Sequence, residues 1–202
     1  MLLDEMANRG LSDETRMMKD VTRKFSNEHV IPFVRQNWKA EWNMNPDERL
    51  PRKILEKANE IGIRTLGVPE EFGGTPLDPA TETQSFAVIS EEISRGDCGL
   101  AEKLVQIWKV SVLLRNVAPR HLQEKWFPQV VKDPTFLLSH CLTEPRGASD
   151  RWLPYDVPEA MMHTKPEFKN GKWVINGRKQ FITNAYDAKL YVVYATTKPG
   201  AG

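Results

Sequence analysis

Two short segments in the last third of the chain carry the residue types with which a protein could hold a flat redox ring. Residues 139–150 pass from a strand-like run into a loop rich in hydroxyl-bearing and small residues, and Phe181 to Thr183 form an aromatic-Ile-Thr sequence. A flavin needs hydrogen-bond donors along its pyrimidine edge and at N5, where electron density accumulates on reduction, and an apolar wall against its rings. Hydroxyls and backbone N–H groups at strand ends supply the donors, and Phe181 supplies the wall. These segments therefore predict a flavin site.

Four stretches of the sequence, taken in order, resemble the acyl-CoA dehydrogenase family. They are residues 66–74 (Leu-Gly-Val-Pro-Glu-Glu-Phe-Gly-Gly), 91–97, 142–145 (Leu-Thr-Glu-Pro) and 175–184. The likeness covers nearly the whole chain and the front portion of a family whose members have an N-terminal helical domain, a middle β domain and a C-terminal helical bundle. It implies an α+β fold: an N-terminal all-α helical domain at residues 1–132, followed by an incomplete antiparallel β-barrel-like domain at residues 133–202.

The resemblance implies FAD as the cofactor and assigns eight cofactor-binding positions. They are His140, Cys141, Leu142, Thr143, Ser149, Phe181, Ile182 and Thr183. Thr143 and the backbone of Leu142 are expected to face the pyrimidine carbonyls, with Phe181 beside the ring. Thr183 is expected to donate toward N5. Ser149 is expected near the pyrophosphate and the pantetheine arm, which makes it the substrate-binding position as well.

The loop after the first segment departs from the family pattern. Arg146-Gly147-Ala148 stands where relatives commonly have Gly-Ala-Gly, and a glycine chosen for a positive φ is not freely replaced by arginine. Arg146 could instead pair with a phosphate. Residues 151–163 form a longer connection than usual, rich in aromatic residues and proline. We interpret this connection as the mark of a subfamily, close to the thioester end of the substrate pocket.

The activity implied by the resemblance is the α,β-desaturation of an acyl-CoA thioester, with hydride transfer to flavin N5. The implied partners are an electron-transfer flavoprotein or similar acceptor and, at full length, other copies of the chain in a dimer or tetramer. The family's catalytic base lies in the C-terminal bundle, so no residue of this chain is assigned that role. Two alternatives stay open: a truncated, non-catalytic protein of the same scaffold that binds flavin, CoA esters or partner subunits, and the related oxidases and monooxygenases.

Hydrophobic spacing predicts the elements that position these segments. A first helix is expected from an N-cap at Ser12 to about Pro32, with Met17, Met18, Val21 and Phe25 inward. Further helices are expected from Pro51 to a stop at Gly62, over residues 81–95 and 100–117, and after Pro119. Strands are expected at residues 136–142 and 190–197, with a hairpin of residues 172–175 and 179–183 across Asn176-Gly177.

Several residues carry a less specific interpretation. Taken alone, Phe181 would be read as a core residue, and Glu91-Glu92 as a solvated helix face with Glu91 pairing with Arg95. The four histidines show no metal-ligand spacing. The last strand, residues 190–197, is apolar on both faces and is expected to be buried in a sheet, which favours a fragment or a truncated reading frame.

Composition favours neither nucleic acid nor an anionic membrane as a partner. The 202 residues are 40% apolar and carry a formal charge of +1, which gives no electrostatic footprint for nucleic acid or for an anionic membrane surface. No apolar run approaches the length that spans a bilayer, and the first residues lack the pattern of a signal peptide, so a cytoplasmic location is expected. Cys98 and Cys141 are far apart and are expected to be reduced.

Overall fold

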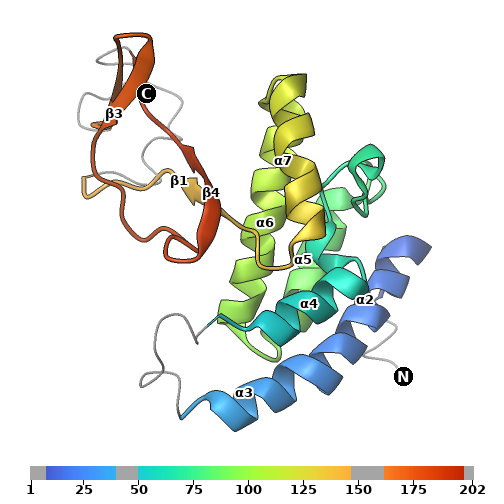
Figure 1. Cartoon of the computed structure of the whole chain (residues 1–202). Coiled ribbons are helices and arrows are strands. Elements are labelled where there is room, and N and C mark those ends of the chain that lie inside the picture. Colours follow the sequence, from blue (N-terminus) through green and yellow to red (C-terminus); the bar gives the residue numbers. More distant parts are fainter. Residues whose placement is uncertain (1–7, 40–49, 147–161, 198–202) are drawn as a thin grey trace. The chain divides into compact units, whose positions relative to one another are not determined.

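The computed structural model describes residues 8–39, 50–146 and 162–197. The chain divides into two compact units, residues 1–137 and residues 138–202. The described part of the first unit is helical, and the described part of the second contains strands and irregular segments (Figure 1).

The helices of the first unit follow the sequence pattern closely. They are α2 (Asp13–Phe25), η1 (Ser26–Val30), α3 (Ile31–Asn37), α4 (Arg52–Glu60), η4 (Ile63–Thr65), η5 (Glu70–Phe72), α5 (Glu82–Ser94), α6 (Cys98–Val117) and α7 (Arg120–Lys132). α5 packs against both α2 and α6, and α6 also contacts α7 (Figure 1). The expected stop at Gly62 is confirmed, because this residue, the second after the end of α4, has a left-handed φ of 80°.

The first helix begins as expected but continues past its expected end. The Ser12 hydroxyl accepts a hydrogen bond from the Thr15 amide, which confirms the N-cap. The helix does not end near Pro32. A π-helical turn, η1, leads into α3, where Pro32 occupies one of the first two positions, and the backbone stays helical there although Pro32 has no N–H to donate.

The inward face of α2 is more polar than the hydrophobic spacing predicted. Met18 and Phe25 are buried as expected, but Met17 and Val21 are 60% and 38% exposed. Buried threonines take their place, and the Thr15 hydroxyl bonds to that of Ser85 on α5 at 2.8 Å. The polar contact between these two helices is therefore satisfied within the protein.

Glu92 belongs to the same contact, and its interpretation as part of a solvated face was wrong. Its side chain is buried and accepts hydrogen bonds from Arg23 at 2.7 Å and from Arg95 at 2.9 Å. Burial alone would raise the pKa of Glu92, but the bonds from the two guanidinium groups outweigh it and lower the pKa. Arg95 thus pairs with Glu92 rather than with Glu91 as predicted.

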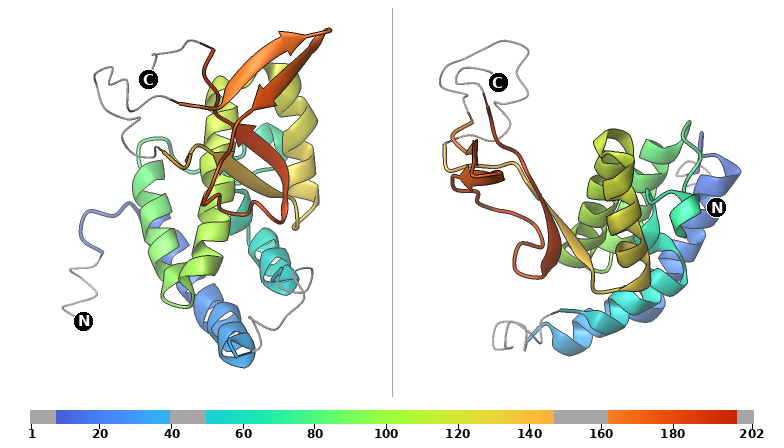
Figure 2. Two further views of the ribbon diagram at one scale, coloured as in Figure 1. Left: turned by 90° about the vertical axis from the view of Figure 1, so that its left-hand side faces the viewer. Right: turned by 45° about the horizontal axis from the view of Figure 1, so that its top comes forward.

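The hairpin of the second unit lies one Asn-Gly pair earlier than predicted. β2 (Lys165–Lys169) pairs antiparallel with β3 (Lys172–Asn176) (Figure 2, left). In this register Phe168 lies opposite Trp173. Asn170 and Gly171 form the turn, with φ of 52° and 74°, the sign that both central residues of a type I′ turn require. The second pair, Asn176-Gly177, ends β3 instead, and the predicted strand at residues 179–183 is irregular.

A second pair of strands brings the two ends of this unit together. β1 (Leu137–Cys141) is hydrogen-bonded to β4 (Ala188–Val193), which are the expected first and last strands with slightly shorter bounds. β1 is largely buried, whereas β4 alternates between half-buried and exposed residues. The expectation that the last strand is buried on both faces is therefore wrong for the described residues. No closed barrel forms among them.

Candidate functional site

The structure brings the two predicted site segments side by side. The amide of Gln180 donates to the carbonyl of Thr143 at 3.1 Å. The hydroxyl of Ser139 donates to the carbonyl of Thr183 at 2.8 Å. Because these two bonds lie at different points along the segments, residues 139–144 and 179–184 run beside each other over several residues.

His140 and Cys141 lie on β1 and contact the chain beyond β4. The ring nitrogen Nε2 of His140 is 2.9 Å from the Tyr194 hydroxyl, and the Tyr194 amide donates to the Cys141 carbonyl at 3.1 Å. Burial raises the pKa of the Cys141 thiol, and the charge of Lys179 only partly offsets this effect. Since a thiol must ionise to act as a nucleophile, Cys141 is suited to packing rather than to covalent chemistry.

The peptide that follows β1 offers donor groups at one residue. Leu142 is already engaged, because its amide contacts the His140 carbonyl at 3.2 Å and its own carbonyl accepts from Lys179 at 2.9 Å. Thr143 differs. Its carbonyl is bonded to Gln180, while its amide and its hydroxyl have no partner within residues 8–39, 50–146 and 162–197. Those two groups are the donors that the end of this strand can offer to a ligand.

Phe181 has an unusual conformation for an aromatic residue. Its side chain is 87% exposed, so the interpretation of Phe181 as a core residue is wrong. Its φ is 55°, a left-handed value that is uncommon for bulky residues. Ile182 and Thr183, both half-buried, lead into a turn in which the Ala185 amide donates to the Ile182 carbonyl at 3.1 Å. An apolar ring is therefore exposed to solvent on the residue that follows Gln180, whose amide is bonded to Thr143.

Other predicted features fall outside the described residues. Ser149 is among them, together with Gly147, Ala148 and most of the long connection at residues 151–163. Arg146 is the last described residue of the loop, and it is exposed. The predicted roles of Ser149 and of the long connection stay predictions.

Sequence reasoning missed an ion pair at the centre of this site. The Glu144 carboxylate, whose side chain is 1% exposed, accepts from Lys179 Nζ at 2.8 Å. It also accepts from the amides of His163 at 2.7 Å and Thr164 at 3.0 Å. Burial would raise the pKa of Glu144, but these hydrogen bonds, with that of Lys179 the strongest, lower it to about 2. A carboxylate with so low a pKa and three bound donors is unsuited to act as a general base near pH 7.

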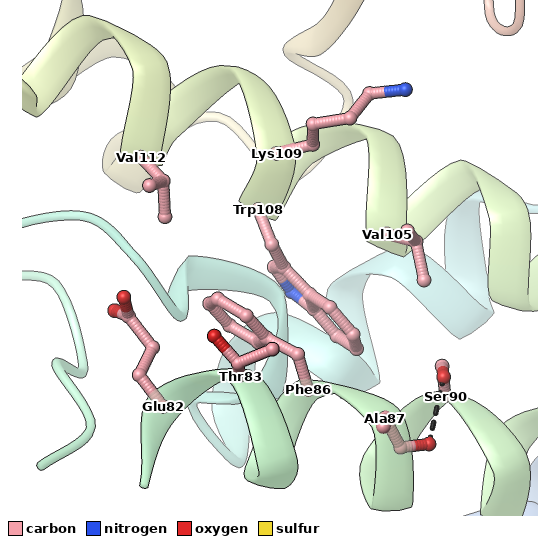
Figure 3. Close-up of a pocket in the computed structure, with 9 residues that line it drawn as sticks. All are labelled: Glu82, Thr83, Phe86, Ala87, Ser90, Val105, Trp108, Lys109 and Val112. Atoms are coloured by element: carbon pink, nitrogen blue, oxygen red, sulfur yellow. Dashed lines mark hydrogen bonds between the residues drawn. The ribbon is translucent and has the colours of Figure 1, made fainter. Parts of the chain in front are cut away.

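The helical unit has a separate hollow between α5 and α6. It has a volume of about 400 Å³, and Phe86 stacks on Trp108 at its centre with ring centroids 5.4 Å apart (Figure 3). The carboxylate at its edge, Glu82, is bound by both terminal nitrogens of Arg115. The hollow thus offers apolar walls, and its acid is already paired.

Among the described residues, no three His, Cys, Asp or Glu side chains are grouped as metal ligands would be. No described helix has both the length and the apolar character needed to cross a bilayer.

Comparison with known proteins adds independent findings. The sequence profile described as "Acyl-CoA dehydrogenase, N-terminal domain" matches residues 12–133, and that described as "Acyl-CoA dehydrogenase, middle domain" matches residues 139–202. Similar curated proteins include (2S)-methylsuccinyl-CoA dehydrogenase of Cereibacter sphaeroides, 30% identical over 93% of this chain and 31% of its own length. Glutaryl-CoA dehydrogenase of Desulfococcus multivorans is 30% identical over 95% of this chain and 45% of its own.

Solved structures show the same fold. An acyl-CoA dehydrogenase from Bacillus anthracis, complexed with FAD, superimposes with a TM-score of 0.74 and 27% sequence identity. The superposition covers 94% of this chain and 30% of that one. The chain therefore spans less than half the length of the relatives that it matches.

Proposed function

Because this chain belongs to the acyl-CoA dehydrogenase family, we propose that it supplies the helical domain and part of the flavin site of an enzyme that desaturates acyl-CoA thioesters. FAD, when bound, would supply the acceptor for the hydride. The relatives named above act on methylsuccinyl-CoA and glutaryl-CoA according to their names, which supports a thioester of coenzyme A as the substrate class. An electron-transfer flavoprotein is the proposed acceptor of the electrons.

The residues present fit an isoalloxazine ring. A flat ring needs donors at one edge and an apolar surface against one face, and the two segments present both. Thr143 has an amide and a hydroxyl without a partner among the described residues, and the adjacent segment carries a Phe181 ring that is 87% exposed. The single observation that carries the proposal is the bond between the Gln180 amide and the Thr143 carbonyl, which joins the donor segment to the aromatic segment.

Within this site we propose distinct roles for the predicted residues. Thr143 donates to the pyrimidine edge, Phe181 covers one face of the ring, and Thr183 donates toward N5. His140 and Cys141 act through the backbone of β1, which carries the Leu142–Thr143 peptide to the ring. Ile182 packs beneath the segment. Ser149 remains a proposed contact to the pyrophosphate and the pantetheine arm.

Titration of the purified chain with FAD tests the proposal. We expect bound oxidised flavin to co-elute with the chain, and Phe181→Ala to weaken FAD binding about two- to tenfold, as stacking contributions of about 0.5–1.5 kcal/mol imply. Tyr186→Ala is the matched control, because Tyr186 is also an exposed aromatic residue of the same unit, at 70%. Absence of any flavin binding by the chain, or equal effects of the two substitutions, would contradict the proposed site.

The same preparation addresses the alternative of binding without turnover. Bound flavin that bleaches on addition of an acyl-CoA thioester indicates desaturation. Bound flavin that is not reduced does not separate the two candidates, because the family's base is expected outside residues 1–202. A coding sequence that continues past codon 202 into a dehydrogenase-like helical bundle favours the enzyme, and a stop codon there favours the non-catalytic protein.

A further inference from the structure

We propose that the Glu144–Lys179 ion pair positions the two flavin-contacting segments and keeps the net charge beside the flavin at zero. This inference rests on the proposed function. It assigns Glu144 and Lys179 as positioning residues, because they act through the peptides that they hold rather than through contact with reacting atoms.

The first support is the way in which Glu144 joins three separate parts of the chain. Its carboxylate is bound by Lys179, 35 residues further on, and by the backbone amides of His163 and Thr164. Glu144 directly follows Thr143 in the chain, and residues 163–164 directly precede β2. A single buried carboxylate therefore holds the donor peptide, the start of the hairpin and the aromatic segment together.

The second support is the number of bonds between residues 179–180 and residues 142–144. Lys179 Nζ bridges the Glu144 carboxylate and the Leu142 carbonyl, at 2.8 and 2.9 Å. The Gln180 amide donates to the Thr143 carbonyl at 3.1 Å, and its side-chain amide to the Glu144 carbonyl at 3.4 Å. Because Phe181 follows Gln180 directly, these bonds fix where the backbone of Phe181 lies relative to Thr143.

The third support is electrostatic. Both charges are largely buried, with side chains 1% and 11% exposed, so removing either partner leaves an uncompensated charge that water screens poorly. Electron density accumulates on a flavin when it is reduced, so a neighbouring cation favours the reduced form and a neighbouring carboxylate favours the oxidised form. The intact pair has no net charge and therefore favours neither the reduced nor the oxidised form.

Removing the carboxylate and removing the cation should therefore shift the midpoint potential of the flavin in opposite directions. In Glu144→Gln the Lys179 cation loses its counterion, and we expect the ratio of affinities for reduced and oxidised flavin to rise about tenfold. In Lys179→Met the carboxylate is left unpaired, and we expect the ratio to fall about tenfold. For a two-electron couple, each tenfold change is a shift of about 30 mV in midpoint potential, upward and downward respectively. The double variant has no net charge at this position and is expected to return toward the wild-type potential.

Dye-coupled reductive titration of the flavin-loaded chain measures these potentials. Glu167→Gln and Arg178→Met are the matched controls, since each removes the same charge from an exposed residue of the same unit, and both are expected to leave the potential unchanged. Lys179→Arg keeps the cation and is expected to keep the potential. Shifts of the same sign in the two single variants, as a purely structural lesion would give, or a lowered potential in Lys179→Arg, overturn the charge assignment.

Hydrogen exchange in the flavin-free chain tests the positioning role independently. The Gln180 amide, bonded to Thr143, is expected to exchange at least tenfold faster in both single variants than in the wild type and in the two controls. Unchanged exchange at Gln180 overturns the positioning role whether or not flavin binds. If the wild-type chain binds no flavin, the proposed function fails, while the exchange rate at Gln180 still decides whether the ion pair holds the two segments together.

Discussion

Replacement of Arg64 by methionine should destabilise the helical unit, because this arginine is bonded to the chain segment where α7 ends. Its side chain is fully buried. Nη1 donates to the Val130 carbonyl at 2.5 Å and Nη2 to the Phe136 carbonyl at 2.8 Å, with further bonds to Asp133 and Asn59. Val130 lies four residues before Pro134, which has no N–H to donate to it, so Arg64 supplies the donor that the helix cannot.

The expected loss of unfolding free energy follows from the two buried hydrogen bonds to Val130 and Phe136. Hydrogen bonds to a charged group contribute about 1.5–3 kcal/mol each, so the bonds to Val130 and Phe136 together contribute about 3–6 kcal/mol. The lower end is the better estimate, because burial of the guanidinium is itself costly: it lowers the pKa of Arg64 to about 10, against the favourable charge of Asp133. We therefore expect Arg64→Met to reduce the free energy of unfolding by about 3 kcal/mol.

Urea unfolding followed by far-ultraviolet circular dichroism measures this loss, because every described helix belongs to the first unit. With a slope of about 1–3 kcal/mol per molar urea, the midpoint should fall by about 1–3 M. Arg52→Met is the matched control, since Arg52 is exposed at the first position of α4, and it should stay within about 0.5 kcal/mol of the wild type. A loss below about 0.5 kcal/mol in Arg64→Met, or an equal loss in the control, would refute the reasoning.

Two further predictions concern the second unit. A Cβ added at Gly177 would lie 2.6 Å from the Cα of Thr164, so Gly177→Ala must displace backbone. We expect the free energy of unfolding to fall by about 1–3 kcal/mol, measured by thermal unfolding followed through tryptophan fluorescence. An unchanged unfolding temperature would show that Thr164 moves away freely. The second is a pH dependence: because the folded-state pKa of Glu144 is about 2 against an ordinary 4.5, its contribution to stability is complete above pH 4.5 and is lost as the pH falls toward 2. Wild-type chain should lose about 2–3 kcal/mol more than Glu144→Gln over that window in acid titration of the same fluorescence, and parallel curves would exclude this linkage.

Residue type and spacing within a few positions were sufficient to predict most of the helices of the first unit. The Ser12 cap, the left-handed Gly62 and the helices that became α5 and α6 were predicted from residue type and spacing, because each depends on neighbours within a few positions. The errors in this unit arose where distant residues decide the outcome. Glu92 was interpreted as solvated because its own helix does not reveal Arg23, which lies on α2 and binds it.

In the strand region the sequence does not show which of two Asn-Gly pairs forms the hairpin turn. Asn170-Gly171 and Asn176-Gly177 are the same dipeptide six residues apart, and turn chemistry alone cannot choose between them. The structure uses the first for the turn and the second for a close approach to Thr164 that leaves no room for a side chain at Gly177. Choosing the wrong pair moved the predicted hairpin forward and turned an irregular segment, residues 179–183, into a strand.

The predicted site segments nevertheless lie side by side. Their pairing was predicted from the resemblance to the family, which does not depend on the hairpin, so the hairpin error concerned only their local form. The sequence did not reveal the ion pair that joins the two segments. Glu144 and Lys179 are 35 residues apart, and no periodicity relates them.

The conformation of Phe181 is the strongest sign that this surface is completed by something other than the described residues. A bulky side chain with a φ of 55° is strained, and an aromatic ring that is 87% exposed gains almost nothing from burial. Strain at a residue that contributes little to the core persists only where neighbouring bonds impose it, and here the bonds of Lys179 and Gln180 to residues 142–144 lie directly before the ring. The proposed flat ligand would cover this exposed ring and accept hydrogen bonds from the amide and hydroxyl of Thr143, which have no partner among the described residues.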